Sequence, residues 1–281
     1  MAALMVRHSG SQGGRVTGDD ARLPTVRAPE DAPLRAVRPG REVLLVLGLS
    51  LGASAVYSVV DLADSLSRGP LKGQTTTLNP TLSNRPLFDL IYQLLAIGTD
   101  LVPVLLALYL LAAPGLGGLR RIGLDRRRPG FDVGGGVLLA LAIGVPGLGL
   151  YLAAVGLGLN LSVNTAGIGG QWYAVPVLVL SALRAALQEE VIVVGFLVTR
   201  LDDLRWRPWA VLLASALLRG SYHLYQGFGG FLGNAVMGAV FVLVYRRFGR
   251  VAPLVVAHFL LDLVSFVGYD LVKAIAPALL P

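Results

Sequence analysis

Seven long apolar stretches constrain this sequence more than any other feature. They cover roughly residues 43–63, 87–112, 135–159, 174–199, 208–226, 229–245 and 251–272. A helix that crosses the hydrocarbon core of a bilayer needs about 20 mostly apolar residues. The chain is also only 15% charged, whereas a soluble domain carries about 25% charged residues. The sequence therefore predicts an all-α, polytopic transmembrane helix bundle with about seven spans, and it excludes an ordinary soluble enzyme.

The two parts of the chain differ in composition. Residues 1–42 are rich in Arg, Gly, Pro and Asp and lack apolar periodicity, which predicts a disordered, Arg-rich N-terminal tail. Residues 43–281 form the predicted membrane-embedded domain, and the polar residues discussed below lie in a core at about 174–272. The first apolar stretch begins too far along the chain for a cleaved signal peptide, so we expect it to remain as an anchor.

The basic residues predict an orientation. With the N-terminus inside, the inside segments hold 18 of the 24 Lys and Arg residues and the outside segments hold four. The positive-inside rule therefore predicts an N-in, C-out protein. We expect a multi-pass protein of a bacterial plasma membrane whose partners are the lipid bilayer and a peptide or membrane protein. Because most basic residues lie between apolar stretches, the net charge of +7 does not indicate a nucleic-acid partner.

Ionisable side chains inside the predicted spans are the candidate functional residues. Each costs about 2.5–3.5 kcal/mol at the bilayer centre, so such residues tend to mark functional sites. The candidates are Glu189 and Glu190 in the fourth stretch, Arg219 and His223 in the fifth, and His258 and Asp262 in the seventh. Arg219 and His223, like His258 and Asp262, are four residues apart and share a helix face.

The predicted depths of these residues agree only in part. At about 1.5 Å per residue, Glu189 and His223 both lie some 21–24 Å from the turn at 202–207. His258 lies only about 10 Å from the start of its own stretch. These predicted depths differ, and they can agree only if a helix is tilted or if a helix boundary lies elsewhere.

These residue types suit hydrolysis of an amide bond. A carboxylate can take a proton from water, and histidines can orient that water, hold a metal or stabilise an oxyanion. The sequence contains no HExxH zinc motif, no GxSG serine motif and no GxGD aspartyl motif. It also contains no cysteine, which excludes thiol nucleophiles and cysteine metal sites.

Three motifs in this order resemble the CPBP family of intramembrane proteases, which includes the CAAX prenyl endopeptidases and bacteriocin-processing or immunity proteins. The family pattern of a Glu pair followed by xxxR corresponds to Glu189 to Val194, FxxxH corresponds to Arg219 to His223, and HxxxN corresponds to His258 to Asp262. The resemblance covers about a third of the chain.

The resemblance implies roles for the matched residues. Glu189 is the expected base, His223 would position the water or a metal, and His258 with Asp262 would bind the oxyanion. Because family members are usually called metalloproteases, the resemblance suggests a divalent metal such as zinc, with Glu189, His223 and His258 as candidate ligands; a metal-free mechanism is equally compatible with the residues.

Two positions depart from the family pattern. Val194 replaces the family arginine, and Arg219 replaces the family phenylalanine. We hypothesise that these changes compensate, so that Arg219 supplies the missing guanidinium, neutralises Glu190 and leaves Glu189 as the base.

Three alternatives stay open at this point. The charged residues could form an ion-pair network that only holds the helices together. The chain could be a catalytically silent relative that binds a membrane partner, as immunity proteins do. It could also be a small proton-coupled transporter, although the sequence shows no internal repeat of the kind that many transporters have.

Overall fold

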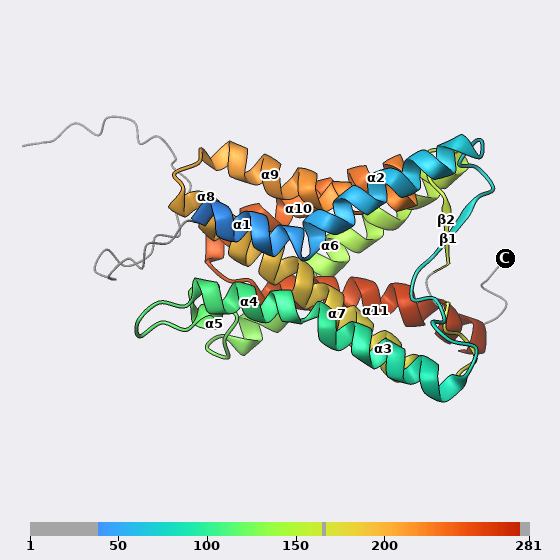
Figure 1. The fold of residues 1–281 in the computed structure, drawn as a ribbon, viewed down its shortest axis with the longest axis horizontal. Coiled ribbons are helices and arrows are strands. Elements are labelled where there is room, and N and C mark those ends of the chain that lie inside the picture. Colours follow the sequence, from blue (N-terminus) through green and yellow to red (C-terminus); the bar gives the residue numbers. More distant parts are fainter. Residues whose placement is uncertain (1–38, 165–166, 276–281) are drawn as a thin grey trace, which may run out of the picture.

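The computed structural model describes residues 39–164 and 167–275, with side chains as far as residue 268, and is mostly helical (Figure 1). The first half contains α1 (Pro39–Gly48), α2 (Leu51–Ser67), β1 (Thr75–Thr77), α3 (Pro86–Asp100), α4 (Val102–Leu111), α5 (Gly118–Arg121) and α6 (Pro129–Gly156). The second half contains β2 (Ser162–Asn164), α7 (Ala174–Glu189), the π-helix η1 (Glu190–Phe196), α8 (Leu197–Asp203), α9 (Pro208–Ser221), the short 3-10 helix η2 (Leu224–Gln226), α10 (Phe228–Phe248) and α11 (Ala252–Ile275).

Each of the seven predicted stretches is helical in this structure, and successive stretches run in alternate directions along the long axis (Figure 1). Among the described residues, three helices are long and apolar enough to cross a bilayer: Pro86–Leu111, Pro129–Gly156 and Phe228–Phe248. A fourth crossing results if α1 and α2, which meet at an angle of 49°, are counted as one span. The chain is thus a helical membrane protein, while seven spans and the N-in orientation remain predictions.

Two details differ from the sequence-based description. Helix α1 begins at Pro39, so the last four residues of the predicted tail are helical, and the remainder of that tail lies outside the described residues. Strands β1 and β2 form a small parallel sheet, in which Thr76 pairs with Val163, where we expected only loops. Both strands are three residues long and carry no apolar alternation that would reveal them in the sequence.

The buried apolar residues divide the molecule lengthwise. One large cluster fills the half that contains α1, α4, α8 and the inner parts of η1 and α10. Toward the other end it is replaced by two separate clusters, one around α7 and α11 that includes Tyr173 and Phe266, and one around α2 that includes Leu62 and Leu161. The buried core therefore divides into two separate clusters about halfway along the bundle.

Arginine–carboxylate pairs stabilise the end of the bundle that the large apolar cluster fills. Arg200 pairs with Glu42 of α1 at 2.9 Å and also with Asp203. Arg250, in the turn before α11, contacts Asp125 at 3.0 Å. Burial opposes ionisation of Asp125, but hydrogen bonds from the Arg127 backbone N–H and the Arg250 guanidinium lower the pKa of this carboxyl. The pair therefore stays charged at neutral pH and ties the loop before α6 to the start of α11.

A glycine sets the distance between α6 and α11. A Cβ at Gly136 would lie 2.5 Å from the Cβ of Val256 and 2.9 Å from the carbonyl oxygen of Pro253. No larger side chain fits there without moving one helix, and α11 carries two of the candidate site residues.

We predict that Gly136→Ala lowers the unfolding temperature of the purified protein in detergent. Overpacking of this kind costs about 1–3 kcal/mol, which exceeds the gain in helix propensity of about 1 kcal/mol from replacing a helical glycine by alanine. The matched control is Gly134→Ala on the same helix, where an added Cβ meets nothing within 4 Å. The control should be at least as stable as the native chain, and equal unfolding temperatures for the two variants would contradict the predicted clash.

Candidate active site

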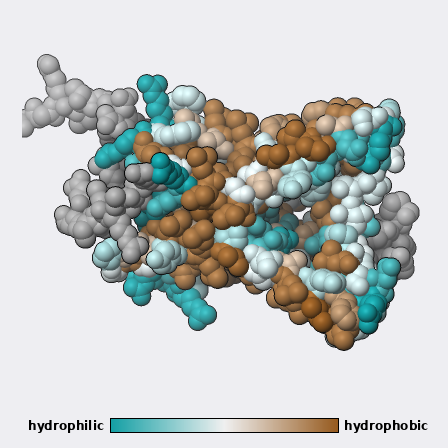
Figure 2. Space-filling view, viewed as in Figure 1, coloured by the Kyte–Doolittle hydropathy of each residue, from teal (hydrophilic) through white to brown (hydrophobic). Residues whose placement is uncertain are grey.

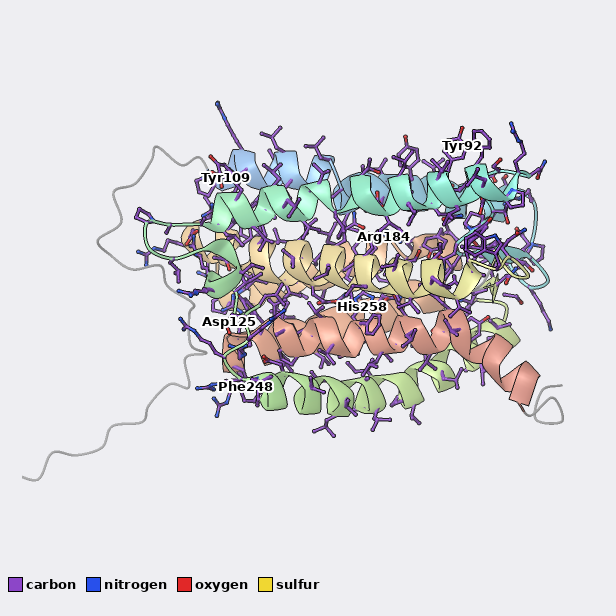
Figure 3. All side chains as sticks on the ribbon, turned by 90° about the horizontal axis from the view of Figure 1, so that it is seen from below. Tyr92, Tyr109, Asp125, Arg184, Phe248 and His258 are labelled. Carbon is purple, nitrogen blue, oxygen red and sulfur yellow. The ribbon has the colours of Figure 1, made fainter. Side chains whose placement is uncertain are left out.

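The site lies where the buried core divides. Its side chains come from three parts of the chain. Helix α7 ends at Glu189, and the π-helix η1 begins at Glu190. Arg219 lies in the last turn of α9, and His258 lies in the first half of α11. His258 is near the middle of the long axis, between α7 and α11 (Figure 3). Short π-helical segments are frequent at functional sites, and here the change of helix type falls between the two glutamates.

Arg219 is the central contact of the site. Its side chain is fully buried and forms a two-pronged ion pair with Glu190, in which Nη1 donates to Oε2 at 3.3 Å and Nη2 donates to Oε1. Nη2 also lies 3.1 Å from Oε2 of Glu189 and 3.1 Å from Nδ1 of His258. The hypothesised pairing of Arg219 with Glu190 is therefore present, and contacts with Glu189 and His258 accompany it.

Space for the Arg219 side chain comes from α10. A Cβ at Gly238 would lie 3.1 Å from the Cδ of Arg219, and the guanidinium carbon of Arg219 lies 5.1 Å from the ring centre of Phe241. Val194, at the family's arginine position, is completely buried in the large apolar cluster. In this chain the positive charge therefore lies on α9 and not on the helix of the glutamates.

The two glutamates have different environments. Glu190 is fully buried, and both of its oxygens are bonded to Arg219, one of them also to His258. Glu189 is 12% exposed, and Oε2 accepts hydrogen bonds from Arg219 and from the hydroxyl of Tyr222 at 2.7 Å. No partner is present for Oε1 of Glu189 among the described residues. Glu189 therefore has one carboxylate oxygen available to a water molecule, and Glu190 has none.

Tyr222 is a site residue that the sequence analysis missed. It is buried, lies one residue before His223, and holds Oε2 of Glu189 through its hydroxyl. The second motif specifies only its first and last residues, so Tyr222 falls in its unspecified part. Its position three residues after Arg219, at the predicted depth of the site, is the sequence signal that could have identified this hydroxyl.

His223 has a defined orientation. It follows the end of α9, its Nδ1 lies 3.0 Å from the carbonyl oxygen of Arg219, and its ring packs 4.8 Å from the ring of Tyr222. A carbonyl oxygen only accepts, so Nδ1 must carry the proton in this hydrogen bond. The Nε2 atom of the neutral ring then has a lone pair that can accept a hydrogen bond or a proton.

His258 lies between two carboxylates. Its Nδ1 is 2.7 Å from Oε1 of Glu190, and its Nε2 is 3.5 Å from Oδ2 of Asp262. The two residues share one face of α11, as their spacing predicts. Asp262 is 23% exposed and His258 is 6% exposed, so Asp262 lies nearer to the open side of the site.

The predicted metal ligands do not fit a metal ion in this arrangement. No group of three His, Asp or Glu side chains among the described residues has the geometry to hold a metal. The guanidinium of Arg219 contacts Glu189, Glu190 and His258, so a positive charge already lies beside two of the three predicted ligands. The structure thus assembles all six candidate residues, but not the three-ligand set.

The difference in predicted depth has a physical explanation. Helix α11 does not start at the level of the turn between α8 and α9. The backbone N–H of Val251 donates to the carbonyl oxygen of Ile122 at 2.8 Å, and Ile122 packs against Gly195 in η1. The start of α11 is therefore already one to two helical turns from Glu190, which places His258 level with the glutamates.

A second ion pair lies next to the site, on the side where the side chains are more exposed. Arg184 of α7 pairs with Asp100, at the end of α3, at 2.9 Å, and it also donates to Gln188 at 3.2 Å. Asp100 is 45% exposed and Arg184 is 24% exposed. Both lie outside the three motifs, and the structure shows them to be half-exposed, ion-paired neighbours of the site.

Comparisons with known proteins agree with the site. A family model described as type II CAAX prenyl endopeptidase Rce1-like matches residues 171–264, a third of the chain that contains all six candidate residues and Tyr222. Neither the curated proteins nor the solved structures gave a match. The match confirms the resemblance that the three motifs carry, and it identifies the site-bearing third of this chain as Rce1-like and consistent with a protease of the CPBP family.

Proposed function

We propose that this protein is an intramembrane endopeptidase that uses Glu189 to activate a water molecule. The observation that carries the proposal is the contrast between the two glutamates: Glu189, with a side chain that is 12% exposed, has Oε1 without a partner among the described residues, whereas both oxygens of Glu190 are bonded to Arg219 and one of them also to His258. A general base must reach the proton that it abstracts, and only Glu189 of the pair can do so. The Rce1-like match supports the same reaction class at the level of the family.

Each side chain has a defined task in the proposed reaction. Glu189 takes a proton from water while the water oxygen attacks the carbonyl carbon of a peptide bond. The negative charge then develops on the carbonyl oxygen of the tetrahedral intermediate. When the C–N bond breaks, the proton held by Glu189 passes to the leaving amine. His223, through Nε2, accepts a hydrogen bond from the attacking water and orients it.

The oxyanion requires a hydrogen-bond donor. His258 supplies one from Nε2 when this nitrogen carries a proton. Asp262, 3.5 Å from the same nitrogen, accepts this hydrogen bond when no substrate is present. Tyr222 and Arg219 hold Oε2 of Glu189, so that Oε1 points to the water.

The proposed reaction is metal-free. Arg219 supplies a fixed positive charge next to both glutamates, and no step requires a Lewis acid. Together with the predicted topology, this describes a multi-pass protease of a bacterial plasma membrane that acts on a peptide or a membrane-anchored protein.

We predict that Glu189→Gln reduces peptide cleavage about 10²–10⁴-fold, since a general base contributes this much to the rate. The measurement compares the N- and C-termini of membrane proteins by mass spectrometry in cells that express the native chain or the variant at matched levels. Asp61→Asn on α2, an exposed carboxylate outside the site, is the control for loss of one charge. Identical termini with the native chain and Glu189→Gln would indicate a catalytically silent binding protein.

We predict strong energetic coupling between Arg219 and Glu190. Arg219→Gln leaves a buried carboxylate without its main partner, and Glu190→Gln does the same to the guanidinium; each should destabilise the protein by about 3–5 kcal/mol. The double variant removes both charges and should lose less stability than the sum of the single changes, as measured by thermal unfolding in detergent.

The exposed pair Asp64 and Arg68, 3.1 Å apart and about 60% exposed, is the matched control. Its double-mutant cycle should show a coupling below about 0.5 kcal/mol. Additive losses in the Arg219 and Glu190 cycle would contradict the proposed role of this ion pair.

We predict that cleavage is unaffected by chelators. Activity in the presence of EDTA or 1,10-phenanthroline should equal that of the untreated protein, because Arg219 already supplies a positive charge beside Glu189, Glu190 and His258. Loss of activity that added Zn²⁺ restores would show that the site rearranges to bind a metal.

A further inference from the structure

Among the described residues, the side chains of the site become more exposed toward one end of the bundle. From Glu190 toward α8, every residue from Val191 to Phe196 is buried, and the large apolar cluster fills this half of the bundle. In the other half, α2 packs on α9 and η2, whereas α3 packs on α7. Helices α2 and α3 diverge in this direction, and the surface between them is hollowed (Figures 1 and 2). This hollow, which we call the cleft, lies at the end of the bundle where the core divides into two clusters.

Charged groups along this cleft indicate that it contains water. The exposed fraction of the carboxylates increases away from Glu190, from 0% there to 12% at Glu189, 23% at Asp262 and 45% at Asp100. Asp100 lies about halfway along the apolar segment Pro86–Leu111. An exposed charge at that depth is costly in lipid and is found where it faces a bundle interior or a water-filled cavity. Hydrophilic residues are visible inside the hollow (Figure 2).

The arginines give this cleft a direction relative to the membrane. The closed end carries Arg200, Arg246 and Arg250 together with the arginine-rich loop before α6, whereas the open end carries the β1–β2 sheet and few basic residues. Segments rich in Lys and Arg stay on the cytoplasmic side. The closed end is therefore expected to face the cytoplasm.

We propose that the catalytic cleft opens to the extracytoplasmic side of the membrane and receives the outer-leaflet peptide segment of a membrane-anchored protein. This inference rests on the proposed function and names its substrate class. The two helices on either side of the gap, α2 and α3, carry exposed apolar residues such as Val60 and Leu95, which suit contact with lipid, so a lipid-anchored or single-span substrate can enter sideways from the bilayer. A protein that presents its cleavage site only in the cytoplasm cannot reach Glu189.

The absence of cysteine from the sequence permits a direct test that does not depend on activity. Single cysteines are introduced as Asp100→Cys in the cleft, Thr75→Cys at the open end and Arg207→Cys at the closed end. Val102→Cys is the matched control, because Val102 is 59% exposed, lies two residues from Asp100 and therefore faces the opposite side of the segment. A sulfonated, membrane-impermeant maleimide is applied to intact cells and to inside-out vesicles.

In intact cells we expect labelling of Asp100→Cys and Thr75→Cys, and no labelling of Arg207→Cys or Val102→Cys. In inside-out vesicles only Arg207→Cys should react. Labelling of Asp100→Cys solely in inside-out vesicles, or in neither preparation, would overturn the inference.

The terminal-peptide comparison of the native chain with Glu189→Gln separates this inference from the proposed function. Termini that depend on the native chain and lie in extracytoplasmic or outer-leaflet segments support both. Native-dependent termini in cytoplasmic segments would overturn the inference while supporting proteolysis. An absence of native-dependent termini would count against the protease itself, and the labelling pattern would still decide the direction of the cleft.

Discussion

A buried guanidinium organises the functional half of this protein. Arg219 cannot remain in an apolar bundle without acceptors, and its acceptors are both glutamates of the preceding helical segment. The ion pair fixes α9 against η1 and places Tyr222 and His223 in the following turn. It also removes Glu190 from contact with water, which leaves Glu189 as the exposed carboxylate. One electrostatic requirement thus determines the packing of two helices and the division of tasks between two adjacent, chemically identical residues.

The sequence predicts much of this site, because intramembrane charge is rare and its spacing has few geometric interpretations. All six candidate residues meet at one place, and the hypothesised exchange of an arginine between neighbouring helices agrees with the contacts of Arg219. The helix assignments agree as well, since long apolar stretches leave the backbone few alternatives to helix. The number of membrane crossings is a different quantity and is not settled by helical conformation.

Other features depend on contacts between distant parts of the chain, and the sequence does not reveal them. The level of His258 depends on the backbone pairing of Val251 with Ile122, more than a hundred residues apart. The contacts of Arg219 with Glu189 and His258, two of the predicted metal ligands, join separate helices, and spacing along the chain does not reveal them. Tyr222 was missed because its role depends on a hydroxyl direction, and β1 with β2 because each strand is too short to carry a pattern.

The short α9 has a consequence for how the chain enters the membrane. It has 14 residues, which is too short to span a hydrocarbon core of about 30 Å. Its last turn also carries Arg219, a charge that is costly to insert into lipid without a partner. Its acceptors precede it in the chain, in the segment that emerges from the ribosome immediately before. We therefore expect α9 to insert as the second arm of a hairpin with α7 to α8, in which Arg219 pairs with the two glutamates.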